Sequence, residues 1–330
     1  MSATLTEAEA APPRPPKKPR LNVRDVGSQT AGSKRRRFPI APWLLLAPSI
    51  ILLGIMVGYP TVTMIVNSFT DYEIKNKMLD IPANFVGFDN YVEIFTKGDF
   101  PAVLARSLGL MVVLTVLICV GGMLLAMLML KLSKGWRLAV SIGLLLAWAM
   151  PPLAATVVWG WIFDTNYGVV NYVLNLITGT NDWNGHPWLL NPWSFMMVLV
   201  IIIVWQGIPF AAFTFFAGLG QVPDEVLEAA QLDGANWWER FRFIIVPYMR
   251  NVLTAVIILE TIWNLRIFTQ VYALQQRGGL ASETNVLPTY IFRQGLGEFG
   301  VTAAIGVVMV ILLAGISYFN VRRTLKEEVL

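Results

Sequence analysis

The strongest constraint in this sequence is a set of long stretches that contain no Asp, Glu, Lys or Arg. An α-helix rises ~1.5 Å per residue, so about 20 residues cross a ~30 Å hydrocarbon core, and each stretch is long enough to do so. Their apolar residues do not alternate with polar ones, which argues against the strands of a membrane barrel. The sequence therefore predicts membrane-spanning helices in the stretches Phe38–Thr70, Ser107–Leu130, Leu138–Phe163, Gly185–Pro223 and Phe299–Val321.

A sixth candidate span, from Asn251 to Phe268, is apolar except for Glu260, Asn264 and Arg266. Charged residues make up only 14% of the 330 residues, against about 25% in an average soluble protein, and the mean hydropathy is +0.59. A soluble enzyme of this length would need a polar surface that this composition does not supply. We predict an all-α integral membrane protein whose residues 40–330 form six transmembrane helices.

The distribution of basic residues predicts the orientation of these helices. With six spans both termini lie on one side, and 18 of the 25 Lys and Arg fall in segments 1–37, 131–137, 221–250 and 322–330. The positive-inside rule places these segments, and so both termini, in the cytoplasm. Residues 1–39 are Pro-rich and basic, and we expect a disordered cytoplasmic tail near anionic lipid rather than a nucleic-acid-binding segment.

The outer segments are expected to carry short helices at the membrane surface, around Val92–Phe95 and Gly168–Leu174. The single Cys, Cys119, and the single His, His186, can supply neither a disulfide framework nor a metal site by themselves.

The predicted cytoplasmic loop 221–250 has an unusual pattern. Pro223, Asp224 and Glu225 suit the first turn of a helix, and Gly234 suits its C-terminal end, where a positive φ is favoured. A second amphipathic stretch follows and leads to Pro247. The pattern predicts two short helices bent at Gly234. It leaves two interpretations open: an ordinary elbow between spans, or an element on which another protein docks.

The same loop resembles a known family. Glu228-Ala229-Ala230, three residues, Gly234, nine residues and Ile244-Ile245-Val246-Pro247 are similar to the EAA loop of bacterial ABC importer permeases, with Val246 as the one departure. The remaining chain looks like the maltose-type branch of sugar permeases, through Val86–Tyr91 and Trp159-x-Trp161-x-Phe163 among others. It departs from that branch at Leu280, where Pro is usual, and it lacks a large outer insertion.

The resemblance implies a type I ABC importer permease fold in the bacterial cytoplasmic membrane. The chain would pair with a second permease subunit as a heterodimer, receive a sugar from an extracytoplasmic binding protein and dock on two ATPase subunits. It would bind no cofactor, since ATP and Mg would be used by the ATPase; its nearest match to a phosphate-binding loop, Gly27-x4-Gly32-Ser33-Lys34, has Ser and Lys transposed. The coupling residues implied are Glu228, Ala229, Ala230, Asp233, Gly234, Phe241 and Pro247.

Glu260 is the most conspicuous residue inside a predicted span, about 15 Å from the cytoplasmic end at Arg250 by helix rise. Trp263 and Asn264 lie three and four positions later, so the three share one helix face. A carboxylate and an amide beside an aromatic ring suit a saccharide, and the resemblance aligns these residues with solute-contacting positions. An ion pair or hydrogen bond from Glu260 to the partner subunit is the alternative. Trp205 and Gln206, in the fourth span, are candidates for the path or simply for helix packing.

Other transported solutes and other classes of protein fit the sequence less well. A glycerol phosphate type of solute would favour several intramembrane cations, whereas Arg266 is the one available. A secondary transporter would need ion-coupling carboxylates or broken helices in both halves. A membrane-embedded enzyme would need a catalytic constellation that is absent from the sequence. The chain is therefore predicted not to be an enzyme.

Overall fold

The computed structural model describes residues 40–328, so the expectation of a disordered tail over residues 1–39 lies outside the described residues. The chain divides into two units, Met1–Met56 and Val57–Leu330, and each is described by itself. The helices in chain order are α1 Ile40–Leu53, the π-helix Gly54–Gly58, α2 Tyr59–Asn67, α3 Ile74–Leu79, α4 Asp89–Thr96, α5 Phe100–Lys131, α6 Lys134–Ala149, α7 Pro152–Ile162, α8 Val169–Thr178, α9 Pro192–Leu219, α10 Asp224–Leu232, α11 Trp237–Arg240, the π-helix Phe241–Ile245, α12 Val246–Tyr248, α13 Arg250–Leu265, α14 Thr269–Gln275, α15 Ala281–Thr284, α16 Leu287–Gln294 and α17 Phe299–Glu328.

The all-α prediction is confirmed, and β-structure within residues 40–328 is limited to one isolated bridge between Thr70 and Phe85. Five helical segments are long and apolar enough to cross a membrane, and a sixth crossing is completed if the bent pair α6 and α7 counts as one span. The five segments are Leu44–Asn67, Phe100–Lys131, Pro192–Leu219, Arg250–Gln275 and Phe299–Phe319.

The third predicted span is broken rather than straight. α6 and α7 meet at an angle of 102°, and the break falls at Met150 and Pro151, which both have extended backbones. Pro151 has no N–H to donate, and a proline disfavours the helical conformation in the residue before it. The pair Pro151-Pro152 therefore ends one helix and starts the next, and it leaves the Met150 carbonyl without a helical partner.

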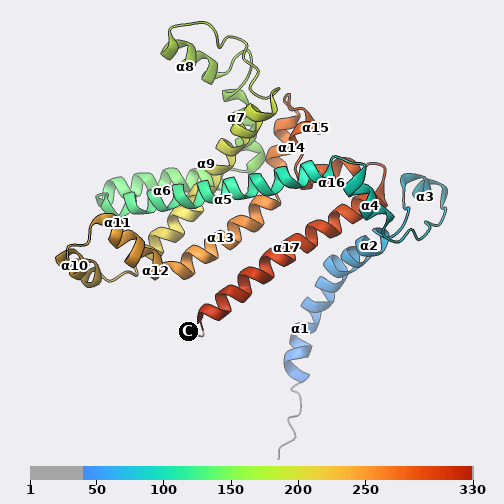
Figure 1. Cartoon of the computed structure of the whole chain (residues 1–330), viewed down its shortest axis with the longest axis horizontal. Helices are drawn as coiled ribbons and strands as arrows, with labels where there is room; N and C mark the ends of the chain where they lie inside the picture. The colour runs from blue at the N-terminus through green and yellow to red at the C-terminus, as the bar shows by residue number, and fades with distance from the viewer. Residues whose placement is uncertain (1–39, 329–330) are drawn as a thin grey trace, which may run out of the picture. The chain divides into compact units, whose positions relative to one another are not determined.

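The core of the larger unit forms where α5 and α9 pack against each other, with α13 lying on both (Figure 1). The close approach of α5 and α9 depends on small residues. A Cβ atom at Gly122 of α5 would lie 2.6 Å from the Cβ of Ala211, and one at Gly207 of α9 would lie 2.6 Å from the Ile118 side chain. Fully buried side chains such as Leu114 fill the interface. This packing fixes the positions of the polar residues that α9 and α13 carry.

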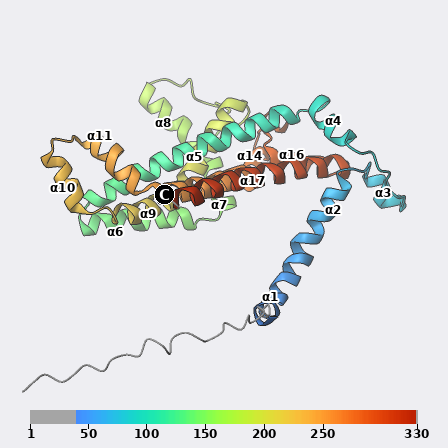
Figure 2. The same ribbon diagram turned by 60° about the horizontal axis from the view of Figure 1, so that its bottom comes forward.

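Opposite ends of the helix bundle carry different connecting segments. α10 and α11 lie at the end where α5 finishes and α6 begins, and α4 lies at the other end, beside the start of α5 (Figures 1 and 2). Figure 1 shows α8 standing out from the bundle beyond α7. The expected short helices near residues 92–95 and 168–174 are present as α4 and α8. The cytoplasmic placement of the termini stays a prediction.

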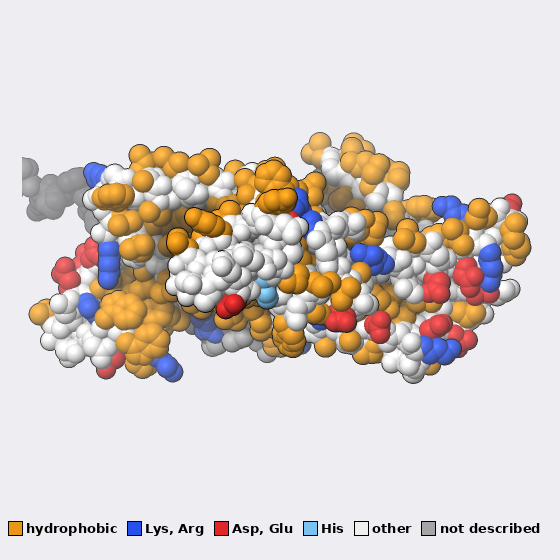
Figure 3. Space-filling model, turned by 90° about the horizontal axis from the view of Figure 1, so that it is seen from above, with side chains coloured by type: hydrophobic (Ala, Val, Ile, Leu, Met, Phe, Trp, Pro, Cys, Tyr) orange, Lys and Arg blue, Asp and Glu red, His pale blue; other side chains and the backbone are white. Residues whose placement is uncertain are grey.

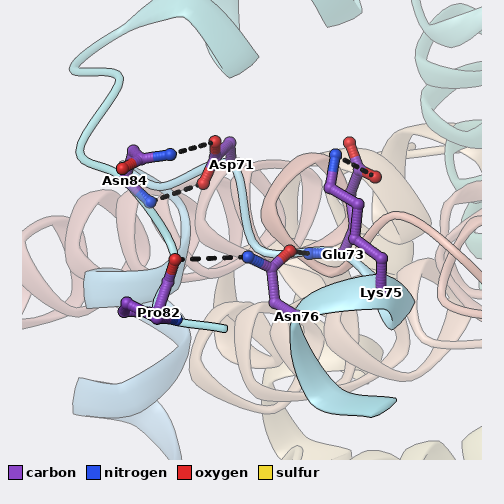
Figure 4. Close-up of polar contacts among 6 residues, drawn as sticks. All are labelled: Asp71, Glu73, Lys75, Asn76, Pro82 and Asn84. Carbon is purple, nitrogen blue, oxygen red and sulfur yellow. Dashed lines mark hydrogen bonds and ion pairs between the residues drawn. The ribbon is translucent and has the colours of Figure 1, made fainter. Parts of the chain in front are cut away.

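Two hydrogen bonds between Asp71 and Asn84, together called the clasp, join the two ends of the segment between α2 and α4 (Figure 4). The Asp71 carboxylate accepts hydrogen bonds from the backbone N–H of Asn84 at 2.6 Å and from its side-chain amide at 3.0 Å. These bonds, the side-chain one first, lower the pKa of the Asp71 carboxyl. The backbone N–H of Gly300 donates to the Tyr72 carbonyl at 2.8 Å, so the clasp is also attached to the start of α17.

Candidate functional site

A polar pocket of about 390 Å³ lies within the bundle, where the α6–α7 break faces α9, α13 and the start of α14. It brings together four of the five residues predicted for the solute path. The wall also includes Met150 and Pro152 from the break and Arg266 from the end of α13. The predicted path residues that line it are Gln206, Glu260, Trp263 and Asn264.

Glu260 and Asn264 form a buried pair, with 2% and 6% of their surfaces exposed. The Asn264 amide donates to Glu260 Oε2 at 3.4 Å and to Thr115 Oγ1 of α5 at 3.1 Å. The structure thus places these two side chains on one helix face, as their spacing predicts. Glu260 Oε1 is buried with no hydrogen-bond partner among the described residues. A buried oxygen in that state can still accept a hydrogen bond from a donor that enters the pocket.

Trp263 extends the same wall as an apolar surface. Its ring is 45% exposed and packs edge-on against Phe210 of α9, with ring centroids 4.9 Å apart. The pocket therefore presents an aromatic ring beside amide and carboxylate groups, which is the combination that binds a molecule with both an apolar face and hydroxyl groups.

Gln206 ties three elements together at the helix break. Its side-chain amide donates to the freed Met150 carbonyl at 2.7 Å, and its oxygen accepts from Gln270 of α14 at 3.3 Å. Trp205 lies outside the pocket lining and packs edge-on against Trp159 of α7, with centroids 5.7 Å apart.

Sequence reasoning did not select Met150, Thr115 or Gln270. The Pro151-Pro152 pair was a visible signal for the break. Thr115 and Asn264 are 149 positions apart in the sequence, so no local sequence pattern indicates that they are in contact. Thr115, which binds Asn264, and Gln270, which lines the pocket, could therefore be found only from the packed helices.

The loop between α9 and α13 has the predicted shape of two short helices bent at Gly234. α10 ends at Leu232, and Gly234 adopts φ +88°, in the left-handed region. A Cβ at Gly234 would meet no atom within 4 Å. The glycine is therefore required by backbone conformation rather than by close packing in this chain. α11 begins with a capping box in which Asn236 Oδ1 accepts from the Glu239 N–H at 3.0 Å.

The residues implied for coupling all belong to the connection between α9 and α13. Glu228, Ala229, Asp233, Gly234 and Pro247 are exposed, and Ala230 and Phe241 are half-buried. Phe241 stacks against Trp237 and Trp238, which fixes the start of the second half of the loop. Leu232, the last residue of α10, has 89% of its surface exposed.

The apolar helices and the broken span are those of a multi-pass membrane protein. The comparisons specify it further: residues 118–326 match the model of the family described as "Binding-protein-dependent transport system inner membrane component", and the chain belongs to that family. The prediction of an importer permease is confirmed. The chain is accordingly a transport subunit and not an enzyme.

Individual relatives are similar over most of the chain. The Diacetylchitobiose uptake system permease protein DasB of Streptomyces coelicolor is 36% identical over 321 residues, 96% of this chain and 97% of the relative. The Trehalose/maltose transport system permease protein MalF of Thermococcus litoralis is 30% identical over 72% of this chain and 80% of the relative. A solved bacterial alginate ABC transporter, crystallised with an alginate pentasaccharide-bound periplasmic protein, contains a chain with the same fold. It superposes with a TM-score of 0.71 at 21% identity, covering 85% of this chain and 92% of that one.

Proposed function

We propose that this chain is one of two permease subunits of an ATP-driven importer and forms half of the path for a neutral disaccharide or oligosaccharide. The observation that carries the proposal is the pocket itself, in which Gln206, Glu260, Trp263 and Asn264 converge from α9 and α13. Two relatives, named as a diacetylchitobiose permease and a trehalose/maltose permease, support the same class of solute.

The chemistry of the pocket favours a neutral sugar over an anionic solute. Amide and carboxylate groups exchange hydrogen bonds with hydroxyls, and the Trp263 ring offers a surface for the apolar face of a pyranose. A glycerol phosphate type of solute is less suited, because its charge would meet the buried Glu260 with Arg266 as the one cation in the lining. A secondary transporter is disfavoured by the family to which the chain belongs.

The exposed loop 221–250 is proposed as the docking element for an ATPase subunit. Its apolar and small residues, from Ala229 to Leu232, would lie in a groove of that subunit, and Gly234 would set the bend. ATP and Mg would be bound by the two ATPase subunits and by no residue of this chain. An extracytoplasmic binding protein would deliver the sugar on the opposite side, and both termini would lie in the cytoplasm.

Replacing Gly234 with Val tests the docking proposal. The assembled complex, reconstituted in liposomes with its binding protein, should lose at least tenfold in ATP-driven uptake, because a β-branched residue resists positive φ and changes the bend. Gly87→Val is the matched control: Gly87 also has positive φ, at +61°, and ample room for a Cβ, but lies before α4. Uptake at the parental rate in Gly234→Val would remove the loop from coupling.

Replacing Trp263 with Ala tests the path. We expect a raised KM for uptake and an altered ranking among maltose, trehalose and diacetylchitobiose, with basal ATPase activity preserved. Trp193→Ala is the control, since Trp193 is 86% exposed at the start of α9 and lies outside the pocket. If the solute ranking and the KM are the same in both variants, Trp263 does not face the solute.

A further inference from the structure

The connection between α7 and α9, residues 164–191, forms a compact structure around α8 that we call the α8 platform. It holds a second cavity of about 770 Å³, against about 390 Å³ for the pocket in the bundle. Seen from above, a broad white area of uncharged polar side chains and backbone lies beside the pale-blue histidine (Figure 3). The proposed function gives this cavity no role.

The lining of this cavity has an unusual composition, because none of its fourteen residues is charged and five of them are Asn. The two acidic residues of the platform, Asp164 and Asp182, are not among them. An uncharged lining of this kind offers no counter-charge to a phosphate, a carboxylate or an ammonium group. Amide side chains, in contrast, both donate and accept hydrogen bonds, as a ring of hydroxyl groups requires.

Hydrogen bonds hold α8 to the segment that follows it. Asn171 is 5% exposed; its Oδ1 accepts a buried hydrogen bond from the Trp188 indole N–H at 2.6 Å, and its amide donates to the Thr165 carbonyl at 3.1 Å. Asn175 donates to Asn184 Oδ1 at 2.8 Å and accepts from the Trp183 backbone N–H at 3.0 Å. These bonds connect the two sides of the cavity, so less conformational entropy is lost when a ligand binds between them.

The rim provides the groups that are free to bind. The side chains of Asn166 and Asn181 are exposed, and neither has a hydrogen-bond partner among residues 40–328. Tyr167 is 91% exposed and Tyr172 is 70% exposed. Exposed aromatic rings beside unpaired amides provide stacking surface for the C–H face of a sugar and hydrogen bonds for its hydroxyls.

The platform is also attached firmly to the helices that carry the pocket. Ring contacts run from Trp188 to Phe163 at 5.8 Å, from Phe163 to Trp159 at 6.2 Å and from Trp159 to Trp205 at 5.7 Å between centroids. Trp205 is followed directly by Gln206, which lines the pocket. A continuous row of aromatic contacts therefore runs from the platform to the helix that carries Gln206.

The geometry points to a second, surface-exposed binding site for a neutral saccharide on the α8 platform, formed by Asn166, Tyr167, Tyr172, Asn181 and Asn184. This inference rests on the proposed function for the class of solute, but on a different set of residues. The site would hold a sugar weakly at the entrance, outside the membrane, separately from the pocket around Glu260.

Saturation-transfer NMR on the assembled complex in nanodiscs, without the binding protein, tests this site. The probes are maltose, diacetylchitobiose and glycerol 3-phosphate. We expect transfer to at least one of the two sugars and none to glycerol 3-phosphate. The double variant Tyr167→Ala/Tyr172→Ala should reduce the transfer at least fivefold, and Tyr318→Ala, which removes a 66% exposed tyrosine of α17, should leave it unchanged.

Two further measurements separate the outcomes. Asn181→Ala, a small change at an exposed position, should reduce the transfer without affecting the yield of complex, which guards against misfolding of the double variant. The double variant is also measured in a Trp263→Ala background, in which sugar binding by the pocket around Glu260 is weakened, so that the transfer lost between the two comes from the platform; a failure of the pocket proposal would be visible in uptake and not in this difference. Absence of transfer to both sugars, an unchanged signal in the double variant, or weaker capture of the binding protein with no sugar transfer would each overturn the inference.

Discussion

The loop 221–250 and the α8 platform are both short connections between spans, and each contains a helix that ends near a glycine with positive φ, at Gly234 and Gly179. They differ in the hydrogen bonds that they contain. Side-chain hydrogen bonds within residues 221–249 are exposed, as between Arg240 and Gln231 at 2.7 Å, and apolar side chains such as Phe241 pack against the bundle. In the platform, the hydrogen bond from the Trp188 indole N–H to Asn171 is buried, and the Trp188 ring contacts Phe163 at the end of α7.

This difference indicates what each connection can do. A segment whose hydrogen bonds are exposed can change shape at little cost, because water replaces the bonds that break, which suits the transmission of a movement. A segment that contains a buried hydrogen bond cannot deform without leaving polar groups unpaired, which suits a surface of fixed shape. The following predictions test that contrast, beginning with the change that should affect both connections.

Gly122→Leu should have the largest effect, because α5 and α9 support both connections. Its Cβ would lie 2.6 Å from the Cβ of Ala211 and 3.0 Å from the backbone N of Ala212, so the helices would have to separate. We expect loss of folded complex, measured as the yield of monodisperse protein and its thermal unfolding. Gly109→Leu in the same helix, where a Cβ meets nothing within 4 Å, should fold. Equal yields would show that this contact does not hold the bundle.

Asn171→Ala should affect the platform alone. It removes the acceptor of the buried Trp188 indole N–H, and an unpaired buried donor costs about 1–3 kcal/mol. We expect faster hydrogen exchange over residues 164–191, with exchange in loop 221–250 unchanged. Asn181→Ala, at an exposed position without a described partner, is the control. Faster exchange spread over both connections would contradict the separate attachment of the platform.

A small pH dependence is expected at the base of the platform. Backbone hydrogen bonds from Tyr167 and Asn166 lower the pKa of the Asp164 carboxyl, so its stabilising effect is complete above the unfolded pKa of about 3.9 and is lost as the pH falls through the lower folded value. Exchange of the Asn166 and Tyr167 amides, corrected for intrinsic rates, should therefore accelerate on acidification. Asp164→Asn should remove that dependence; a dependence of the same size in this variant would exclude Asp164 as its source.

Much of the fold could be predicted from the sequence because a bilayer imposes simple requirements on length and polarity. Charge-free runs identified the spans, and the spacing of Glu260 and Asn264 identified a shared face that the structure confirms with a hydrogen bond. The rest depended on tertiary packing. The charge-free run Leu138–Phe163 did not reveal that its two helices meet at an angle of 102°. The hydrogen-bond partners of Asn264 and Gln206 lie far away in the chain.

The freed carbonyl at Met150 has a consequence for how such a pocket can diversify. An acceptor supplied by the main chain is the same whichever amino acid occupies position 150, so substitution there cannot remove it. Its direction follows from the extended backbone of Met150, and the Gln206 amide binds it there. Differences in solute preference between such proteins would therefore arise from side chains on α9 and α13. The Met150 carbonyl would stay available as an acceptor as long as Pro151 and Pro152 are retained.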